Sequence, residues 1–377
     1  MGKRFAESGR MRLLFAIKSL STLGGGAERV FVDVVNGLHR RGHDVAVMTF
    51  EPLDAPSFYR LDEDIRRLEI GARSGSKLGQ LALLPAARRT ITAFAPDVAV
   101  AFMPSSYVPL AAALAMTGVP LIASEHNVPE RYRRLPVRWL SMLVSSALVR
   151  QFTAVSIQMQ EVYPAIVRTK MTVLPNLVTI DPGRRADVVG KGKEEGLIIC
   201  VGRLHPQKDH LTLIQAFGLL ADDFPGWRIR ILGDGSERER LEAEIARLGL
   251  QSRITLAGTV QDIGAEYSAA QLYVIPSRYE SFGLATVEAL AHGLPAVGFA
   301  DCPGTNELIA HGLNGILVTP DGGRVESLAQ SLRKLISDPD YRRQLASGAD
   351  QSKAPSPSVI LDDWETMLGS VSGERSA

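Results

Sequence analysis

An arginine and a lysine share one loop in which they could bind a phosphorylated ligand. Arg203 and Lys208 follow an apolar run at 197–201 that predicts a buried strand, and they lie at or before the start of a predicted helix at 209–220. An arginine grips two phosphate oxygens in a fork and a lysine adds a point charge, so the pair predicts a diphosphate clamp. The local sequence leaves open the alternative of a solvated charged loop.

Two glutamates form a second candidate group. Glu280 falls in a loop after a predicted strand, and Glu288 falls in the apolar helix that follows. A carboxylate buried in an apolar helix is costly unless polar groups satisfy it, and ribose hydroxyls would do so. The helix start between the two glutamates offers backbone N–H groups to a phosphate or sugar oxygen, at Phe282, Gly283 and Leu284. A partly exposed helical glutamate is the simpler explanation of Glu288.

A glycine-rich turn and one histidine complete the candidates. Gly24, Gly25 and Gly26 stand between the first predicted strand and its helix, where glycine allows close approach of a ligand and helix N–H groups can face an anion. This is no dinucleotide fingerprint, because Arg29 occupies the place of the third glycine, and no P-loop lysine follows. A tight structural turn is the alternative. His126, after a later buried strand, is on local evidence a structural histidine.

An alternation of apolar strands and amphipathic helices must position these residues. Strands are expected at 13–17, 44–50, 98–102, 120–123, 153–155 and 173–174, and again at 197–201, 228–232, 254–256, 272–275, 296–299 and 316–318. Helices are expected at 27–41, 209–220, 323–337 and 356–369. This order is typical of parallel βαβ units, in which ligands bind beyond the carboxyl ends of the strands. The sequence predicts an α/β protein with two doubly wound, Rossmann-like domains that face each other across a cleft, joined by the polar segment 181–195.

Composition excludes several classes of protein. The chain has 377 residues, enough for two domains, and its 42 basic residues nearly balance 41 acidic ones, so no basic field recommends nucleic acid as a partner. Cys200 and Cys302 are the only cysteines, which excludes a disulfide scaffold and zinc-binding spacing and suits a cytosolic protein. Asp62 and Asp64 form an Asp-x-Asp pattern, but no strand end precedes it, so we expect no metal site there.

Two apolar stretches bear on membrane insertion. The apolar run near the N-terminus ends at Lys18 and is too short for a signal sequence. Residues 98–124 carry no charge and are long enough to span a bilayer. Prolines and glycine interrupt this second stretch, so we interpret it as strand, helix and strand inside an α/β domain.

Taken together, the candidate segments resemble the retaining glycosyltransferases of family 4, which have the GT-B fold. The most specific match is the E-x7-E spacing of Glu280 and Glu288, and the resemblance covers nearly the whole chain. Further matching segments are GGAERV at 25–30, VGRL with its lysine at 201–208, ILGDG at 231–235, and NELI with GLNGILV at 306–318. The resemblance implies an acceptor-side domain at 1–178, a nucleotide-sugar-binding domain at 179–354, and a last helix at 355–371 that packs back on the first domain.

The resemblance implies roles for the candidates of the second domain. Arg203 and Lys208 would hold the donor diphosphate, Glu288 the donor ribose, and Glu280 the donor sugar or phosphate region. The start of the helix at 282–284 would add backbone N–H groups to the donor site. The family needs no metal and no further cofactor, and the two cations would instead neutralise the leaving diphosphate.

In the first domain, the family's donor-phosphate contacts fall on Gly25 and Gly26, and its histidine near the donor sugar falls on His126. The implied activity is transfer of a hexose or N-acetylhexosamine, with retention, from a nucleotide-sugar, which the resemblance to bacterial members implies is UDP-linked. The implied acceptor is a lipid-linked oligosaccharide or polysaccharide precursor of the cell envelope. A sugar-nucleotide epimerase or hydrolase of the same fold and a non-catalytic nucleotide-sugar-binding protein remain alternatives.

A basic and apolar segment at 130–150 predicts attachment to a membrane surface. Arg131, Arg133, Arg134 and Arg138 precede or open a helix that continues with Trp139 and several apolar side chains. Arginine clusters attract anionic headgroups, and tryptophan favours the interface. We therefore expect a cytoplasmic enzyme held peripherally at the inner membrane, with this segment meeting lipid or a lipid-diphosphate acceptor. A core helix with a solvated basic start is the alternative.

Overall fold

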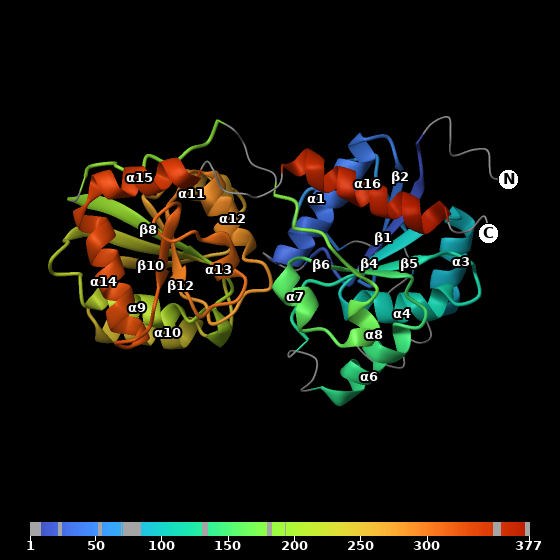
Figure 1. The fold of residues 1–377 in the computed structure, drawn as a ribbon, viewed down its shortest axis with the longest axis horizontal. Coiled ribbons are helices and arrows are strands. Elements are labelled where there is room, and N and C mark those ends of the chain that lie inside the picture. Colours follow the sequence, from blue (N-terminus) through green and yellow to red (C-terminus); the bar gives the residue numbers. More distant parts are fainter. Residues whose placement is uncertain are drawn as a thin grey trace. The chain divides into compact units, whose positions relative to one another are not determined.

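The computed structural model describes residues 9–21, 25–51, 55–68, 70, 84–129, 135–178, 183–192, 194–349 and 356–373. The chain divides into two compact units, each built around one parallel sheet (Figure 1). The first unit contains Met1–Leu177 together with Pro355–Ala377, and the second contains Val178–Ala354. The chain is therefore an α/β protein whose C-terminal segment belongs to the first unit.

The sheet of the first unit has seven parallel strands in the order β3-β2-β1-β4-β5-β6-β7. The strands are β1 (Arg12–Ile17), β2 (Asp44–Thr49), β3 (Arg66–Leu68), β4 (Val98–Phe102), β5 (Leu121–Ser124), β6 (Gln151–Ala154) and β7 (Met171–Val173). The helices are α1 (Gly26–Arg40), α3 (Leu84–Phe94), α4 (Pro104–Leu114), α6 (Pro136–Ser145), α7 (Ile157–Glu161), α8 (Ala165–Arg168) and α16 (Pro357–Gly373). Strands β4 and β5 are buried along their whole length, which explains their unbroken apolar sequence.

The sheet of the second unit has six parallel strands in the order β10-β9-β8-β11-β12-β13. The strands are β8 (Glu195–Val201), β9 (Gly226–Leu232), β10 (Ile254–Gly258), β11 (Leu272–Ile275), β12 (Ala296–Phe299) and β13 (Gly315–Val318). The helices are the 3₁₀ turn η1 (Pro206–Lys208), α9 (His210–Gly218), α10 (Arg238–Arg247), α11 (Ile263–Ala269), α12 (Leu284–Ala291), α13 (Thr305–Leu308), α14 (Arg324–Ser337) and α15 (Pro339–Ala349). Helices α9, α10 and α14 cover one face and α11, α12 and α15 the other (Figure 1).

Both sheets share the strand order of a doubly wound fold. In each sheet the chain starts at a central strand, builds outward to one edge, and then returns to build the other half. The order reverses between β1 and β4 in the first sheet and between β8 and β11 in the second. Ligands of such sheets bind at the carboxyl ends of the strands beside this reversal. The predicted fold class, two Rossmann-like domains of the GT-B type, is confirmed.

The uncharged stretch 98–124 forms β4, α4 and β5 within the first sheet, as its prolines and glycine predict. Across the described ranges, every helix is too short or too polar to cross a bilayer.

The polar segment at 181–195 is part of the second unit where the structure describes it. The buried guanidinium of Arg342 donates to the backbone oxygens of Val188 at 2.9 Å and Gly192 at 2.7 Å. The N–H of Ala186 donates to the oxygen of His292 at 2.9 Å. Burial lowers the pKa of Arg342 to about 10, so this side chain stays charged at neutral pH. A segment without regular structure needs donors for its carbonyl groups, and Arg342 supplies them.

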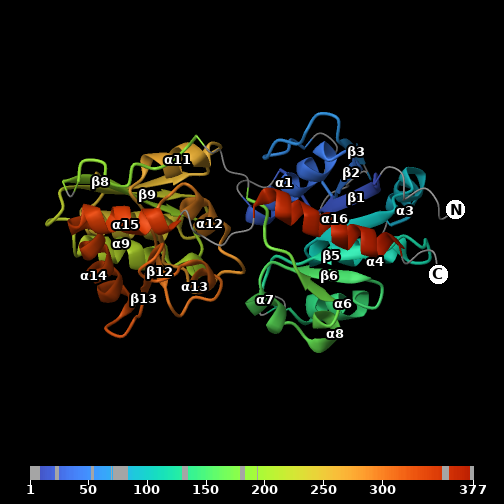
Figure 2. The same ribbon diagram turned by 45° about the horizontal axis from the view of Figure 1, so that its top comes forward.

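Helix α16 joins the first unit from the far end of the sequence and lies beside α1 and β4 (Figure 2). Arg41, at the end of α1, contacts Asp362 and Glu365 at 2.6 Å each. Trp364 is buried against Phe15 and Phe102, with ring centroids 6.2 Å apart in each pair. The helix is therefore held by an ion-pair network at one place and by aromatic packing at another.

We predict that Trp364→Ala destabilises the first unit by about 3–5 kcal/mol, because removing a buried tryptophan leaves a cavity. Val359→Ala, on an exposed position of the same helix, should change the free energy of unfolding by less than about 0.5 kcal/mol. Urea unfolding, with hydrogen exchange read at β1 and β4, measures both variants. Equal effects of the two substitutions would contradict the prediction.

Candidate functional site

Two loops meet at the carboxyl ends of the neighbouring strands β8 and β11. Lys208, at the end of η1, places its ammonium 2.6 Å and 2.8 Å from the two carboxylate oxygens of Glu280. The exposed fractions of the two side chains are 17% and 8%. The structure thus brings together two of the residues singled out in the sequence, as an ion pair that is largely shielded from water.

Glu280 is fixed by further contacts. The hydroxyl of Ser277 donates to its carboxylate at 2.6 Å, and its own backbone N–H donates to the oxygen of Pro303 at 2.9 Å. Gly304 lies directly against the Glu280 carbonyl and has a φ of 81°, so a side chain there would collide and strain the backbone. Contacts to its carboxylate and to its backbone consequently hold Glu280 from three segments of the chain.

The loop that carries Lys208 is tied to the same region through its neighbour Gln207. The oxygen of Gln207 accepts the N–H of Arg278 at 2.9 Å, and the Gln207 side chain donates to the oxygen of Tyr279 at 2.9 Å. The two loops are therefore joined through backbone and side-chain contacts as well as through the ion pair.

Arg203 lies on the same loop in a different setting from Lys208. Its side chain is exposed, and within the described part of the chain no ion-pair partner engages it. Its carbonyl oxygen accepts the Nε2–H of buried His210 at 3.3 Å. The guanidinium of Arg203 is therefore accessible to an anion at the end of β8, while the Arg203 carbonyl is held by His210.

His210 is a neutral support under this loop. Burial lowers its pKa to about 4 and raises the pKa of the Cys200 thiol to about 12, so both groups are uncharged at neutral pH. A carbonyl only accepts, so Nε2 carries the proton, and Nδ1 accepts the thiol hydrogen of Cys200 across 3.4 Å.

Glu288 occupies a separate buried position on α12. The hydroxyl of Tyr267 donates to its carboxylate at 3.0 Å. Gly283, with a left-handed φ of 83°, stands before the helix, which begins at Leu284 with its N–H groups facing out of the first turn. Phe282 precedes this start and is half-buried. The alternative of a partly exposed glutamate is thus excluded, and Glu288 is a buried carboxylate that a tyrosine hydroxyl helps to satisfy.

In the first unit, His126 follows β5 and stacks on the ring of Phe102, with centroids 4.7 Å apart and an interplanar angle of 17°. Phe102 is nearly parallel to Trp364 of α16 on its other side, at 9°. Thr153 donates to the Ser124 hydroxyl at 2.9 Å, which leaves that hydroxyl to donate to His126 Nε2 at 3.0 Å. Burial lowers the pKa of His126 to about 4, so at neutral pH it is a neutral hydrogen-bonding group.

At the glycine turn, a carboxylate of the chain itself lies at the start of α1. Gly25 is the residue before the helix, which begins at Gly26, and the carboxylate of Glu28 folds back directly against Gly25. A helix N-terminus attracts negative charge, and here the helix's own glutamate takes that place. Gly24 lies outside the described residues.

The basic segment is described only from residue 135, so Arg131, Arg133 and Arg134 lie outside the described residues. Arg138 is exposed on α6, and Trp139 is half-buried. Met142 packs inward, whereas Val137, Leu140 and Val144 are 74%, 62% and 65% exposed. The expected apolar helix is thus two-sided, with one face in the core and an apolar face in solvent.

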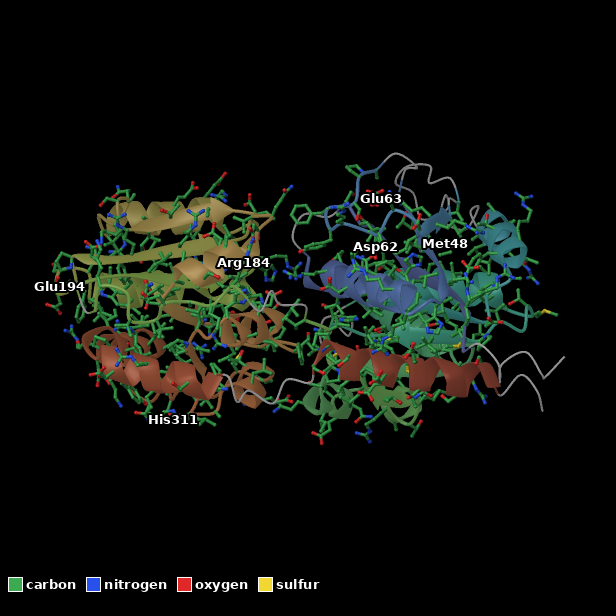
Figure 3. All side chains as sticks on the ribbon, turned by 90° about the horizontal axis from the view of Figure 1, so that it is seen from above. Met48, Asp62, Glu63, Arg184, Glu194 and His311 are labelled. Carbon is green, nitrogen blue, oxygen red and sulfur yellow. The ribbon has the colours of Figure 1, made fainter. Side chains whose placement is uncertain are left out.

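No metal-binding cluster is gathered in the ranges that the structure describes. Asp62, of the Asp-x-Asp pattern, lies near Glu63 at the surface of the first unit (Figure 3). Its carboxylate accepts from Arg40 at 2.7 Å and 2.8 Å. This aspartate has a structural partner.

Sequence reasoning missed several residues that build the site. Ser277 stands in the same loop as Glu280, so its three-residue spacing was an available signal. Tyr267 and His210 carried no such signal, because Tyr267 meets Glu288 from another helix and His210 meets the Arg203 carbonyl only through the turn of their loop.

Two family models match the two halves of the chain. The model described as Glycosyltransferase Family 4 matches residues 24–181, and the model described as Glycosyl transferases group 1 matches residues 184–352.

Individual proteins agree with these matches. An uncharacterized glycosyltransferase of Haemophilus influenzae is 25% identical over 288 residues, which cover 75% of this chain and 79% of that protein. The poly(glycerol-phosphate) alpha-glucosyltransferase of Bacillus subtilis is 30% identical over 121 residues, 32% of this chain and 18% of that protein. The crystal structure of Anabaena HepE in complex with UDP and glucose has a TM-score of 0.78 and 24% identity, and the match covers 96% of this chain and 100% of that one.

We predict that His210 makes stability fall as the pH drops from 6.5 to 4. In that window the unfolded state binds a proton and the folded state, with its pKa of about 4, does not, so the loss approaches about 1.4 kcal/mol per pH unit. His210→Gln should flatten this slope, measured by urea unfolding between pH 4 and 8. His311→Gln, at an exposed position (Figure 3), serves as the control. An unchanged slope in His210→Gln would show that His210 titrates alike in both states.

Proposed function

We propose a specific reaction for this chain, which belongs to glycosyltransferase family 4 and has the GT-B fold. It transfers a hexose or N-acetylhexosamine from a UDP-sugar, with retention, to a lipid-linked oligosaccharide or polysaccharide precursor. The observation that carries the proposal is the Lys208–Glu280 pair beside the exposed Arg203 at the carboxyl ends of β8 and β11. The UDP and glucose in the Anabaena neighbour support a uridine nucleotide donor.

In the proposed reaction the donor diphosphate is held by Arg203 and Lys208. The bond between the sugar carbon and the diphosphate oxygen breaks, and the acceptor oxygen bonds to that carbon on the same face. The acceptor proton passes to the leaving phosphate oxygen. Negative charge grows on the diphosphate during this step, and cations fixed beforehand stabilise it without reorganising. We propose that Arg203 and Lys208 together replace a metal ion and that no cofactor takes part.

Glu280 has a proposed role as the group that aims Lys208. An ammonium has three N–H donors, and the carboxylate takes up two of its directions at 2.6 Å and 2.8 Å. The third N–H of Lys208 then points away from Glu280 in a fixed direction. Such a fixed donor suits a lysine that stabilises the negative charge growing on the diphosphate. Glu280 also lies where donor sugar contacts are expected for the family.

The nucleoside end of the donor is proposed to bind at α12. Glu288 is a buried carboxylate that can accept hydrogen bonds from ribose hydroxyls, and the helix start at Phe282, Gly283 and Leu284 offers N–H groups to a phosphate. In the first unit, neutral His126 is proposed to hydrogen-bond a sugar hydroxyl. The N–H groups at Gly25 and Gly26 are proposed to contact donor phosphates in place of the Glu28 carboxylate, which lies against Gly25 in this structure.

The acceptor is proposed to reach the enzyme at the cytoplasmic face of the inner membrane. The exposed apolar face of α6 beside the exposed Arg138 suits a lipid surface, because apolar side chains enter the interface while arginines meet anionic headgroups. The Bacillus relative is named for a polymer, poly(glycerol-phosphate), and this name supports a polymeric acceptor.

Transfer itself is tested by incubating the enzyme with a panel of nucleotide-sugars and undecaprenyl-diphosphate-linked acceptors, in buffer with EDTA, and reading products by mass spectrometry.

We predict that Arg203→Ala lowers turnover by about 10²-fold with little change in thermal melting, because its side chain is exposed. Lys208→Ala should lower turnover at least as much and also reduce stability, because it leaves the Glu280 carboxylate unpaired. Arg343→Ala, an exposed arginine on α15, is the control. Turnover near wild type in both site variants would refute the clamp.

Membrane attachment is tested by flotation with liposomes that contain or lack anionic lipid, at low and high salt. We predict that changing Arg131, Arg133, Arg134 and Arg138 together to glutamate abolishes salt-sensitive binding and weakens transfer to long-chain lipid acceptors. Transfer to a short soluble acceptor should survive. A triple variant should weaken the part of liposome binding that resists high salt; it carries Val137→Ser, Leu140→Ser and Val144→Ser. The control Leu219→Ser, at an exposed position of the second unit, should leave that binding unchanged. Flotation of the arginine variant like wild type would exclude this segment as the contact.

A further inference from the structure

Arg324, the first residue of α14, contacts the loops that carry Lys208 and Glu280. Its side chain is 16% exposed, and its guanidinium lies 3.6 Å over the ring of Phe299. Nη1 donates to both carboxylate oxygens of Asp301, at 2.9 Å and 3.0 Å. Nη2 donates to the oxygens of Pro276 and Ser277, at 3.1 Å and 3.2 Å. A single planar cation thus reaches several segments at once.

The same guanidinium also faces the loop of Lys208. Its Nε lies 3.5 Å from a carboxylate oxygen of Asp209, which a second arginine, Arg278, contacts at 2.9 Å. Asp209 follows Lys208 directly and has a left-handed φ of 51°. Such a conformation costs free energy in a residue other than glycine, and it persists only where the surroundings enforce it. The carboxylate of this strained residue lies between the two arginines, directly beside Lys208.

Three of the residues that Arg324 contacts adjoin the Lys208–Glu280 pair. Asp209 is next to Lys208 in the sequence. Ser277 uses its carbonyl for Arg324 and its hydroxyl for Glu280, at 2.6 Å. Asp301 opens the turn whose Pro303 oxygen accepts the Glu280 N–H at 2.9 Å. The contacts of Arg324 therefore converge on the pair from the ends of β8, β11 and β12.

Arg324 is not placed to bind the donor itself. Both of its terminal nitrogens are taken up by protein oxygens, and its Nε faces a carboxylate. Its face is covered by Phe299. A lysine could not replace it, because one ammonium on a flexible chain cannot form this fork and stack together.

We propose that Arg324 is a positioning residue that locks the loops after β8, β11 and β12 together, so that the Lys208–Glu280 pair is preformed before the donor arrives. This inference rests on the proposed role of that pair in donor binding. Arg324 acts through the pair and touches no reacting atom. Misplacing a charged group by about 1 Å is enough to cost about 10²-fold in rate.

The test compares Arg324→Ala, Arg324→Lys and Arg333→Ala. Arg333 lies on the same helix and pairs with Asp223 at 2.6 Å, so it controls for losing an arginine from α14. We expect Arg324→Ala and Arg324→Lys to lower kcat by about 10²-fold and to weaken UDP binding in calorimetry about tenfold. Arg333→Ala should change neither. Added guanidinium ion should restore part of the activity of Arg324→Ala only.

A double-mutant cycle distinguishes positioning from a general structural effect. If Arg324 acts through the pair, Arg324→Ala combined with Lys208→Ala should be no slower than Lys208→Ala alone. Independent, multiplying losses would overturn the inference. A folded Arg324→Ala with kcat and UDP affinity within twofold of wild type would overturn it as well.

If Arg324→Ala does not fold, Asp301→Asn tests the same role, because it weakens one arm of the network and keeps the arginine. We expect about a tenfold loss of kcat in this variant, and an unchanged kcat would overturn the inference. Lys208→Ala and Glu280→Gln separate this outcome from failure of the proposed function. If those two variants retain wild-type transfer, the proposed donor site is wrong, whereas if they lose transfer and the Arg324 variants do not, only the positioning role is wrong.

Discussion

The ion pair between Lys208 and Glu280 sets the arrangement of the loops at the carboxyl end of the second sheet. Two charges that are largely removed from water are stable only when each has a partner at short range and further hydrogen bonds meet the remaining oxygens. The Ser277 hydroxyl meets that requirement for the Glu280 carboxylate, while Pro303 and the glycine at 304 fix the Glu280 backbone. These contacts limit how far the two loops can rearrange around the pair.

The first unit depends on a different kind of contact. His126, Phe102 and Trp364 form a continuous aromatic stack from the end of β5 through the end of β4 to α16. The last helix of the chain is therefore part of the support of a candidate site residue. Its attachment through Arg41 is charged and half-exposed, so the buried apolar face that contains Trp364 contributes more than the ion pairs to the position of the helix.

The position of the candidate group in the second unit follows from one architectural rule. Both sheets reverse their strand order at the centre, and at that point adjacent loops diverge to opposite faces and leave room for a ligand. His126 follows a strand of the first sheet, while Lys208 and Glu280 follow the two strands at the reversal of the second. Polar side chains gather there because the loops at the carboxyl ends are free to vary while the strands beneath are fixed by burial.

The sequence by itself determined the fold class and the identity of most candidate side chains. The strands Val98–Phe102, Leu272–Ile275 and Ala296–Phe299 coincide with their predicted limits, because an apolar run bounded by turn residues is a local signal. Arg203, Lys208, Glu280 and Glu288 were recognisable because they stand at strand ends or in apolar surroundings. The strand Arg66–Leu68 and the helix Pro339–Ala349 were missed, since a short arginine-rich strand and a largely polar helix lack a clear apolar period.

Only the tertiary structure decided which of these side chains meet. Lys208 and Glu280 are 72 residues apart in the sequence and pair because β8 lies beside β11. Tyr267 reaches Glu288, and Arg324 reaches Ser277 and Asp209, from elements whose local sequence gives no sign of these partners. Helix and strand periods depend on neighbouring residues, whereas an ion pair or a buried hydrogen bond depends on the order in which strands assemble. That order therefore fixes the geometry of the site.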